Sequence, residues 1–336
     1  MGSATPASAM TAQLAEVSRA AALLRAGELV AFPTETVYGL GADAGNPLAI
    51  GKIFAAKGRP ADHPLIVHLP DASHLERWAV DIPEAVGKLA AAFWPGPLTL
   101  ILKRHRSVLD AVTGGQDTVG LRVPDHPLAL QLLREFAGAG GGGLSAPSAN
   151  RFGRVSPTTA AHVHEELGSA VAMILDGGPC AVGIESTILD LSGGEPRILR
   201  PGMLDAAAIG AVLGYPPEFG ATQSAPRVSG SFEAHYAPRT PLQLVAVTDL
   251  AETAREALRS GRRVAVLAAR PPAFSHGSLL YRPASTDAAQ FAHDLYARLR
   301  ELDATGCDVI LVAAPPADEA WRAAADRLRR AAAGSK

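Results

Sequence analysis

Residues 57–68 read KGRPADHPLIVH, and this stretch joins the end of a predicted helix to the start of a predicted strand. Two fixed cations and two imidazoles flank a turn that is bounded by prolines. The apolar run 65–67 that follows predicts a buried strand, because a short run of Leu, Ile and Val after a turn is typical of a strand in a core. The polar turn is either part of a substrate site or a solvated loop between a helix and a sheet.

The sequence around this stretch predicts further helices and strands. Asn46-Pro47 is a cap and first-turn pair for a helix that ends at the quoted stretch. Helices also fit residues 14–26, 83–93, 126–137 and 157–167, the last with Ser156 as its cap, and strands fit 29–32, 65–69, 98–103, 118–123, 171–175 and 186–191. Some strands follow one another directly and others are separated by helices, which predicts an α/β sheet that is not a simple βαβ series.

The last third of the chain shows a cleaner alternation. Residues 214–241 are rich in Pro, Gly and Ser without any period, which predicts a linker. Beyond it, strands fit 242–248, 263–268 and 308–313, and helices fit 250–259, 286–302 and 317–332. This order predicts a small Rossmann-like domain with a three-stranded parallel sheet. A chain of 336 residues is long enough for two such cores.

Composition and charge exclude several classes of protein. The formal net charge is −2 with dispersed Lys and Arg, so we expect no stable binding of nucleic acid. The two cysteines, Cys180 and Cys307, have no disulfide or zinc-site spacing, which fits a reducing compartment. No signal-like start and no apolar run approaching the roughly 20 residues of a membrane helix is visible. These features predict a cytoplasmic protein that does not enter a membrane.

Two motifs suggest chemistry that their context does not support. Gly138, Gly140 and Gly143 match G-x-G-x-x-G, but a predicted helix precedes them and a predicted strand follows, which is the reverse of a dinucleotide site. We expect a surface loop there. Ser186 and Cys180 are possible nucleophiles, yet neither lies in a G-x-S-x-G motif or beside an obvious base. A structural or binding role is the better interpretation of both.

Five polar stretches lie at the ends of predicted strands, at 33–41, 57–68, 118–124, 145–150 and 183–202. Ligands of open α/β sheets bind where strand ends converge, so these stretches could form one cleft; alternatively, each is a separate solvated loop. Arginine and lysine suit phosphate or carboxylate groups, and hydroxyls supply neutral hydrogen bonds. A helix starting at Ser156-Pro157 would add free backbone donors for a phosphate. The candidates are Lys57, Arg59, Arg122, Arg200, Thr34, Thr36, Ser148, Ser156 and Ser186.

The motifs in these stretches resemble those of a known family. PTETVYGLG, KGRP with PLIVH, WPGPLTLIL, LRVPDHP, APSAN with SPT, DGGP, GIEST and ILRPG occur in the order typical of YrdC-like L-threonylcarbamoyl-AMP synthases. The linker's HYAP and the last domain look like the two-domain form of that family. The resemblance implies a YrdC-like twisted open mixed sheet with helices over 11–205, a linker or lid over the active site at 206–240, and a Rossmann-like parallel α/β accessory domain at 241–333.

The resemblance also implies a reaction. Enzymes of this family are nucleotidyltransferases that combine L-threonine, bicarbonate and ATP into L-threonylcarbamoyl-AMP and pyrophosphate. The product supplies the threonylcarbamoyl group for adenosine 37 of tRNAs, and a separate tRNA threonylcarbamoyl transferase performs that later step. Mg²⁺ is expected to bridge the phosphates of ATP without dedicated protein ligands.

Matching positions imply a role for individual residues. The expected L-threonine-binding residues are Thr36, His68, Arg122, Ala146 and Ser186. The expected ATP-binding residues are Lys57, Arg59, His63, Thr118, Ser148, Ser156, Arg200 and Tyr236. Two positions depart from the family pattern: His63 stands where Asn is usual, and residues 228–230 read VSG where the linker often reads SPG. The second departure leads us to expect a looser or differently shaped lid.

Two other functions use related folds. One is an RNA-binding or ribosome-maturation module, which would need a continuous basic face that the dispersed charge does not supply. The other is carbamoyl transfer in hydrogenase maturation, in which a YrdC-like domain is normally embedded among further catalytic domains and zinc-finger cysteines that this sequence lacks.

Overall fold

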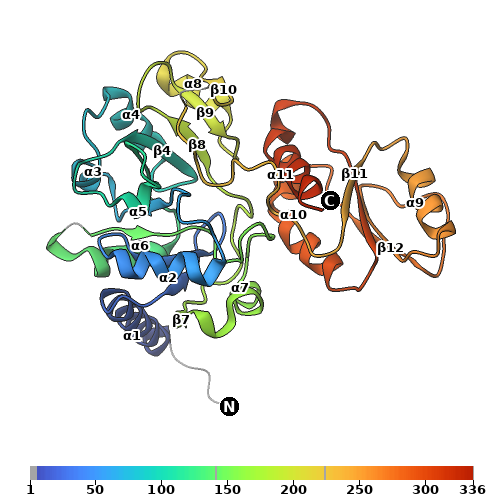
Figure 1. Cartoon of the computed structure of the whole chain (residues 1–336), viewed down its shortest axis with the longest axis horizontal. Helices are drawn as coiled ribbons and strands as arrows, with labels where there is room; N and C mark the ends of the chain where they lie inside the picture. The colour runs from blue at the N-terminus through green and yellow to red at the C-terminus, as the bar shows by residue number, and fades with distance from the viewer. Residues whose placement is uncertain (1–5, 141, 223–224, 336) are drawn as a thin grey trace.

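The chain forms two separate β-sheets, one in each half of the molecule (Figure 1). The structure is a computed structural model that describes residues 6–140, 142–222 and 225–335. The first sheet has ten strands in the order β10-β9-β8-β4-β5-β3-β6-β2-β1-β7, and the second has four in the order β11-β14-β12-β13. The expected combination of a mixed α/β sheet and a separate parallel α/β sheet is confirmed.

The first sheet mixes parallel and antiparallel neighbours. Strand β5 lies parallel to β3 and antiparallel to β4. In spatial order the strands are β10 (Glu218–Phe219), β9 (Arg197–Arg200), β8 (Thr187–Asp190), β4 (Leu98–Lys103), β5 (Thr118–Arg122), β3 (Ile66–His68), β6 (Leu144–Ser145), β2 (Gly39–Asp43), β1 (Val30–Phe32) and β7 (Met173–Ile174).

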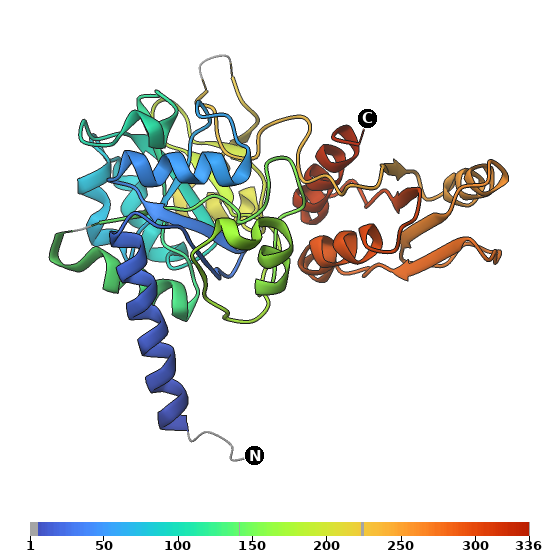
Figure 2. The same cartoon turned by 60° about the horizontal axis from the view of Figure 1, so that its bottom comes forward.

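Helices pack around this sheet. They are α1 (Pro6–Arg25), α2 (Pro47–Lys57), α3 (Leu75–Trp78), α4 (Glu84–Phe93), α5 (Asp110–Thr113), α6 (Pro127–Ala137), α7 (Ala160–Leu167) and α8 (Ala206–Leu213), with short 3₁₀ turns at Ala72–His74, Gly138–Gly140 and Gly168–Ala170. Helix α1 shares an apolar cluster with α6, in which Val17 and Leu24 pack near Leu132. Its first turns project away from the body (Figure 2).

The stretch 57–68 has the structure that its sequence predicts. The Asn46 side chain accepts hydrogen bonds from the backbone N–H groups of residues 48 and 49 and so caps α2. Gly58 ends the helix in the left-handed conformation at φ 62°, which glycine adopts without steric cost. Residue 65 is buried, and β3 follows in the middle of the sheet.

The second sheet is entirely parallel, and we call it and its helices the accessory domain. Its strands are β11 (Leu242–Val245), β12 (Val264–Ala268), β13 (Leu279–Pro283) and β14 (Val309–Ala313), and its helices are α9 (Leu250–Arg259), α10 (Ala288–Asp303), the 3₁₀ turn Glu319–Trp321 and α11 (Arg322–Ala333). Helices α10 and α11 lie on the face toward the first sheet, whereas α9 lies on the far side (Figures 1 and 2).

Two predicted details of the fold are wrong. The accessory sheet has four strands rather than three, because β13 is a half-buried edge strand that ends in a proline and lacks a clear apolar pattern. Helix α7 begins at residue 160 and is capped by Thr159, not by Ser156. The backbone carbonyls of Pro157 and Thr158 instead accept hydrogen bonds from Tyr38 and Cys180, so the predicted phosphate-binding helix start does not exist there.

Regular structure extends into the range 206–240 that was predicted as a linker. Helix α8 opens this range and packs on the core of the first sheet through Ile209, and β10 pairs with β9. Residues 223–224 lie outside the described residues. The G-x-G-x-x-G run lies between α6 and β6 as expected, in a helix-to-strand connection.

Candidate functional site

All five polar stretches contribute to one pocket at the ends of the first sheet's strands. The expected threonine-binding residues Thr36, His68, Arg122, Ala146 and Ser186 all line it, as do Arg59, Ser148, Arg200 and Tyr236 from the expected ATP-binding set. Glu185, Ser229, Gly230 and His235 also line it. The structure therefore supports one shared cleft rather than separate solvated loops.

At one end of the pocket, a buried arginine lies beside neutral polar groups. Arg122 forms an ion pair with Glu35, with 2.6 Å between its Nη2 and the Glu35 Oε1. Burial and this arginine lower the pKa of His68 to about 3, so that its imidazole is neutral at physiological pH. The Thr34 and Thr36 hydroxyls share a hydrogen bond of 2.8 Å. This end can hold a carboxylate and neutral hydrogen-bonding groups.

Two further arginines line the other end of the pocket. Arg59 donates from Nη2 to the Pro64 carbonyl at 2.9 Å, and burial lowers its pKa to about 10, which leaves it cationic. Arg200 donates to the Ser186 carbonyl at 2.9 Å and to the Ser186 hydroxyl at 3.0 Å. Fixed guanidinium groups of this kind suit the oxygens of a phosphate chain.

Four of the expected ATP-binding residues do not line the pocket. Lys57 donates from Nζ to the carbonyls of Ser148 and Asn150, each at 2.5 Å, so it fixes the loop after β6. Burial lowers the pKa of Lys57 well below its usual value, and Arg59 lowers it further. Ser156 donates its hydroxyl hydrogen to the Glu185 carboxylate at 2.6 Å.

The remaining two of these residues face other neighbours. The His63 ring stacks on Phe232, with 4.2 Å between ring centroids, and lies near Phe152. Thr118 lines a smaller adjoining hollow with Val228 and Ser229. His63 therefore contacts aromatic side chains in this arrangement and does not line the pocket.

Several buried polar atoms around the pocket have no protein partner for a hydrogen bond. They include Arg59 Nε, His68 Nδ1, His235 Nδ1 and the Tyr236 hydroxyl. Buried polar groups are normally paired, because leaving one unpaired costs about 1–3 kcal/mol. This group of unpaired atoms indicates a site built for a polar ligand.

A segment of the linker, residues 228–236, covers the pocket, and we call it the strap. Val228 packs among Ile188 and Leu199, and the Ser229 hydroxyl donates to the Pro64 carbonyl at 2.8 Å. With the strap in place, the pocket leaves about 50 Å³ of free space, whereas ligand pockets commonly offer about 300–1,000 Å³. The strap therefore occupies part of the space that a nucleotide would need.

Within the described part of the chain, neither possible nucleophile lies beside an activating base. The Ser186 hydroxyl shares a hydrogen bond of 2.8 Å with Thr99 and accepts one from Arg200, so it is arranged for binding. Burial raises the pKa of the Cys180 thiol to about 12, which keeps it protonated. The arrangement suits reactions that proceed by positioning and charge neutralisation.

Comparison with known proteins establishes the family. Residues 22–202 match the Sua5/YciO/YrdC family model, described as telomere recombination. The chain belongs to this family. Residues 203–333 match a second model, the C-terminal domain of threonylcarbamoyl-AMP synthase, so the two-domain form is present.

Two relatives that are similar to this chain over nearly its whole length are both named threonylcarbamoyl-AMP synthase. The threonylcarbamoyl-AMP synthase of Bacillus subtilis (strain 168) is 41% identical over 327 residues, covering 95% of this chain and 93% of the relative. That of Pyrococcus abyssi is 38% identical, covering 93% and 92%. The crystal structure of P. abyssi Sua5 complexed with L-threonine matches with a TM-score of 0.87 and 37% identity, over 96% of this chain and 95% of that one.

Two further features are absent from the described residues. No helix there has the length and apolar character that a membrane crossing requires. Within the same residues, no three or more His, Cys, Asp or Glu side chains gather as a metal site would require.

Proposed function

We propose that this Sua5/YrdC-family chain is a threonylcarbamoyl-AMP synthase, which converts L-threonine, bicarbonate and ATP into L-threonylcarbamoyl-AMP, pyrophosphate and water. The observation that carries the proposal is the convergence of Arg59, Arg122 and Arg200 with unpaired polar atoms in one buried pocket. The names of relatives that span both domains favour this function over an RNA-binding module.

The Arg122 end of the pocket suits L-threonine. The guanidinium would bind the amino acid's carboxylate, and the hydroxyls of Thr36 and Ser186 would orient its polar groups. Neutral His68 can accept or donate a hydrogen bond without adding positive charge near the amine. An uncharged amine is the form that reacts with bicarbonate-derived CO₂ to give a carbamate.

The Arg59 and Arg200 end suits the phosphates of ATP. There the carbamate oxygen attacks the α-phosphorus, the bond from that phosphorus to the bridging oxygen breaks, and pyrophosphate leaves. Such a displacement depends on alignment and on cations near the developing charge, and it needs no protein nucleophile. Lys57 lies behind this end, where a bound polyphosphate would favour its charged form.

Mg²⁺ fits this pocket through the nucleotide rather than through the protein. Both carboxylates near the pocket are already paired, Glu35 with Arg122 and Glu185 with Arg327. Phosphate oxygens would therefore supply the ligands, and the ion would neutralise their charge. We further propose a cytoplasmic enzyme whose product passes to a separate tRNA threonylcarbamoyl transferase, and a strap that opens to admit ATP and then closes.

A labelled-substrate assay tests the proposed function. Purified protein is incubated with radiolabelled bicarbonate, L-threonine, Mg²⁺ and ATP, and the products are separated and counted. We expect a labelled nucleotide adduct together with pyrophosphate in equal amounts, and neither product when threonine is omitted. Pyrophosphate release that does not depend on threonine would refute the proposal.

A further inference from the structure

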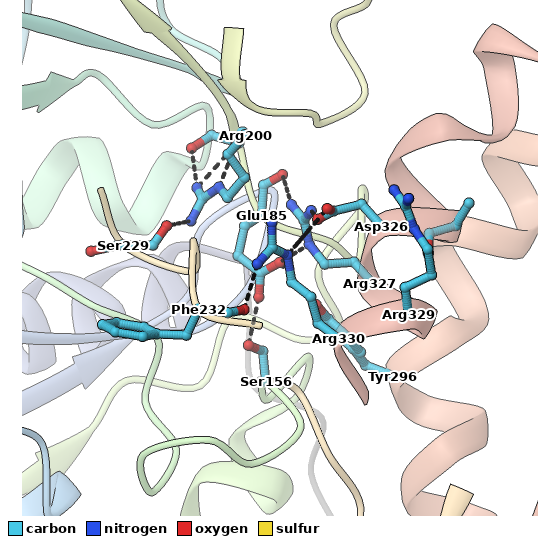
Figure 3. Close-up of polar contacts among 12 residues, drawn as sticks. Ser156, Glu185, Arg200, Ser229, Phe232, Tyr296, Asp326, Arg327, Arg329 and Arg330 are labelled. Carbon is cyan, nitrogen blue, oxygen red and sulfur yellow. Dashed lines mark hydrogen bonds and ion pairs between the residues drawn. The ribbon is translucent and has the colours of Figure 1, made fainter. Parts of the chain in front are cut away.

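The accessory domain contacts the pocket wall through one buried carboxylate. Glu185 lies in the loop before β8 and lines the pocket. Arg327 of α11 donates from Nε to its Oε2 at 2.7 Å, and the Tyr296 hydroxyl of α10 donates to the same oxygen at 2.9 Å (Figure 3). Arg327 has no exposed side-chain surface. Two helices of the accessory domain therefore hold a residue of the first domain's site.

The other oxygen of Glu185 connects this contact to the pocket. Ser156 donates its hydroxyl hydrogen to Oε1 at 2.6 Å, and residue 186, the next in the chain, accepts both backbone and hydroxyl hydrogen bonds from Arg200. Burial alone would raise the pKa of Glu185, but Arg327 and Arg200 together with the Ser156 hydrogen bond lower it to about 2. The carboxylate is therefore a fixed acceptor at neutral pH.

Arg327 also faces the strap. Its guanidinium carbon lies 5.2 Å from the centre of the Tyr236 ring. The Tyr296 ring stacks on the Tyr236 ring, with 5.8 Å between the ring centroids. Tyr236 has φ of 61°, which is unfavourable for a bulky side chain. The position of Tyr236 therefore depends on the side chains that pack around its ring. Arg327 and Tyr296, which both contact it, belong to the accessory domain.

Stability is a weak explanation for such a buried ion pair. The cost of removing two charges from water commonly offsets their attraction, and well-packed apolar side chains often serve as well. A buried pair that also hydrogen-bonds to Ser156 of the first domain and Tyr296 of the accessory domain does, however, fix the relative geometry of the two domains. Arg327 also donates from Nη1 to the carboxylate of Asp326 at 2.7 Å, so its guanidinium contacts a second carboxylate besides Glu185.

We propose that Arg327, supported by Tyr296, is a positioning residue for the nucleotide end of the pocket. It holds Glu185, and through that carboxylate the Ser156 hydroxyl, and it packs directly against the Tyr236 ring in the arrangement that binds ATP. This inference rests on the proposed function. It assigns to the accessory domain a direct part in nucleotide binding, although Arg327 itself does not line the pocket.

The test compares two arginines of the same helix. Arg327→Met should raise the KM for ATP about tenfold, because small displacements of positioned groups are costly, while the KM for threonine stays within about twofold. Arg329 is exposed on the same helix, so Arg329→Met should match the wild type in both constants. A purely structural role would lower the thermal midpoint of Arg327→Met without this split between the two substrates.

Further variants keep the test decisive if Arg327→Met does not fold. Tyr296→Phe removes one hydrogen bond to Glu185 and no charge, and we expect a smaller rise in the KM for ATP. Arg327→Lys should lie between the wild type and Arg327→Met. The double variant Glu185→Gln with Arg327→Met should regain stability, because no unpaired carboxylate stays buried, yet keep the raised KM for ATP.

The outcomes separate this inference from the proposed function. Wild-type protein without threonine-dependent pyrophosphate release would refute the function. An active wild type with an unchanged KM for ATP in Arg327→Met, or in Tyr296→Phe and Arg327→Lys where the methionine variant is unfolded, would refute the inference. A recovery of ATP affinity in the double variant would also refute it, because the loss would then come from the unpaired charge.

Discussion

Arg122 and Glu35 show how a single buried residue pair prepares a site for a ligand. The two side chains are 5% and 7% exposed, and Arg122 uses Nη2 for the ion pair at 2.6 Å and Nε for a hydrogen bond to the Gly96 carbonyl at 3.3 Å, which occupy only part of its five N–H donors. The guanidinium therefore keeps donor capacity for a second anion. The carboxylate of threonine is an anion of suitable size, and Glu35 keeps the guanidinium in place when the site is empty.

Replacing this arginine should affect one substrate selectively. We expect Arg122→Ala to raise the KM for threonine about 10- to 100-fold, since a hydrogen bond to a charged group contributes about 1.5–3 kcal/mol. The KM for ATP should change much less, because Arg59 and Arg200 remain. Steady-state pyrophosphate release at varied concentrations of each substrate measures both constants. An equal effect on both would count against the carboxylate role.

The two neutral histidines of the pocket should make stability depend on pH. Burial lowers the pKa of both His68 and His235 to about 3, with nearby cations contributing. Between that value and the usual pKa of about 6.5 the unfolded chain binds these protons and the folded chain does not. The free energy of unfolding should therefore fall on acidification below about pH 6.5, by up to about 1.4 kcal/mol per pH unit for each histidine.

Urea unfolding at pH 7, 6 and 5 measures this dependence. His68→Gln removes one of the two groups, so its stability should fall less steeply between pH 6 and 5 than that of the wild type. His235→Gln should behave in the same way. A slope that stays at the wild-type value in both variants would show that other groups control the acid response.

At the scale of elements, helices α2 and α7 differ in how far the sequence determines them. Helix α2 is predictable because Asn46, Pro47 and Gly58 each act on their own local backbone. The start of α7 is not, because Ser156-Pro157 resembles a cap and the competing hydrogen bonds come from Tyr38 and Cys180, which are distant in sequence. Edge strand β13 was missed because partial burial leaves little apolar pattern.

The same distinction applies to the candidate site. Residues at strand ends, such as Arg122 and Arg200, could be placed in one cleft because strand ends of a sheet converge. Which of the polar residues line the pocket and which lie behind it depends on side-chain packing, and Lys57 is an example of the second kind. The pair of Glu185 and Arg327 is separated by 142 positions, and no local pattern connects them.

The strap offers a test of the unusual histidine. His63 stacks on Phe232 of the strap, so we expect His63→Asn to weaken the closed strap by about 0.5–1.5 kcal/mol, the range for an aromatic pair. Because the closed strap leaves too little space for a nucleotide, the KM for ATP should then fall roughly two- to tenfold. Phe232→Leu removes the same stacking from the other side and should give a similar value. An unchanged KM in His63→Asn would show that the departure from the family pattern has no effect on nucleotide binding.

At the scale of the whole molecule, the two sheets share one interface core. A single apolar cluster contains Val37, Val155 and Ile184 of the first domain and Leu295 and Leu328 of the accessory domain. The buried Glu185 and Arg327 pair lies in the same region. The accessory domain therefore packs as a continuation of the site wall, and separating the domains would disturb the pocket directly.

Two glycines with similar backbone angles allow this contact to be tested. Gly183 has φ of 82°, and a Cβ there would lie 2.3 Å from the backbone carbonyl oxygen of His293 in α10, whereas Gly178 has φ of 80° and open space around it. Gly178→Ala should cost about 1 kcal/mol through its backbone conformation alone. Gly183→Ala should cost about 1–3 kcal/mol more, because backbone atoms cannot make room without moving α10.

Moving α10 also moves Tyr296, so Gly183→Ala should raise the KM for ATP while Gly178→Ala leaves it near the wild-type value. Urea unfolding followed by circular dichroism gives the free energies, and pyrophosphate release gives the KM. If both alanine variants lose equal stability and keep the same KM, the close approach of α10 to the loop before β8 does not hold the pocket in shape. A larger loss in Gly183→Ala alone ties nucleotide binding to the packing of the two domains.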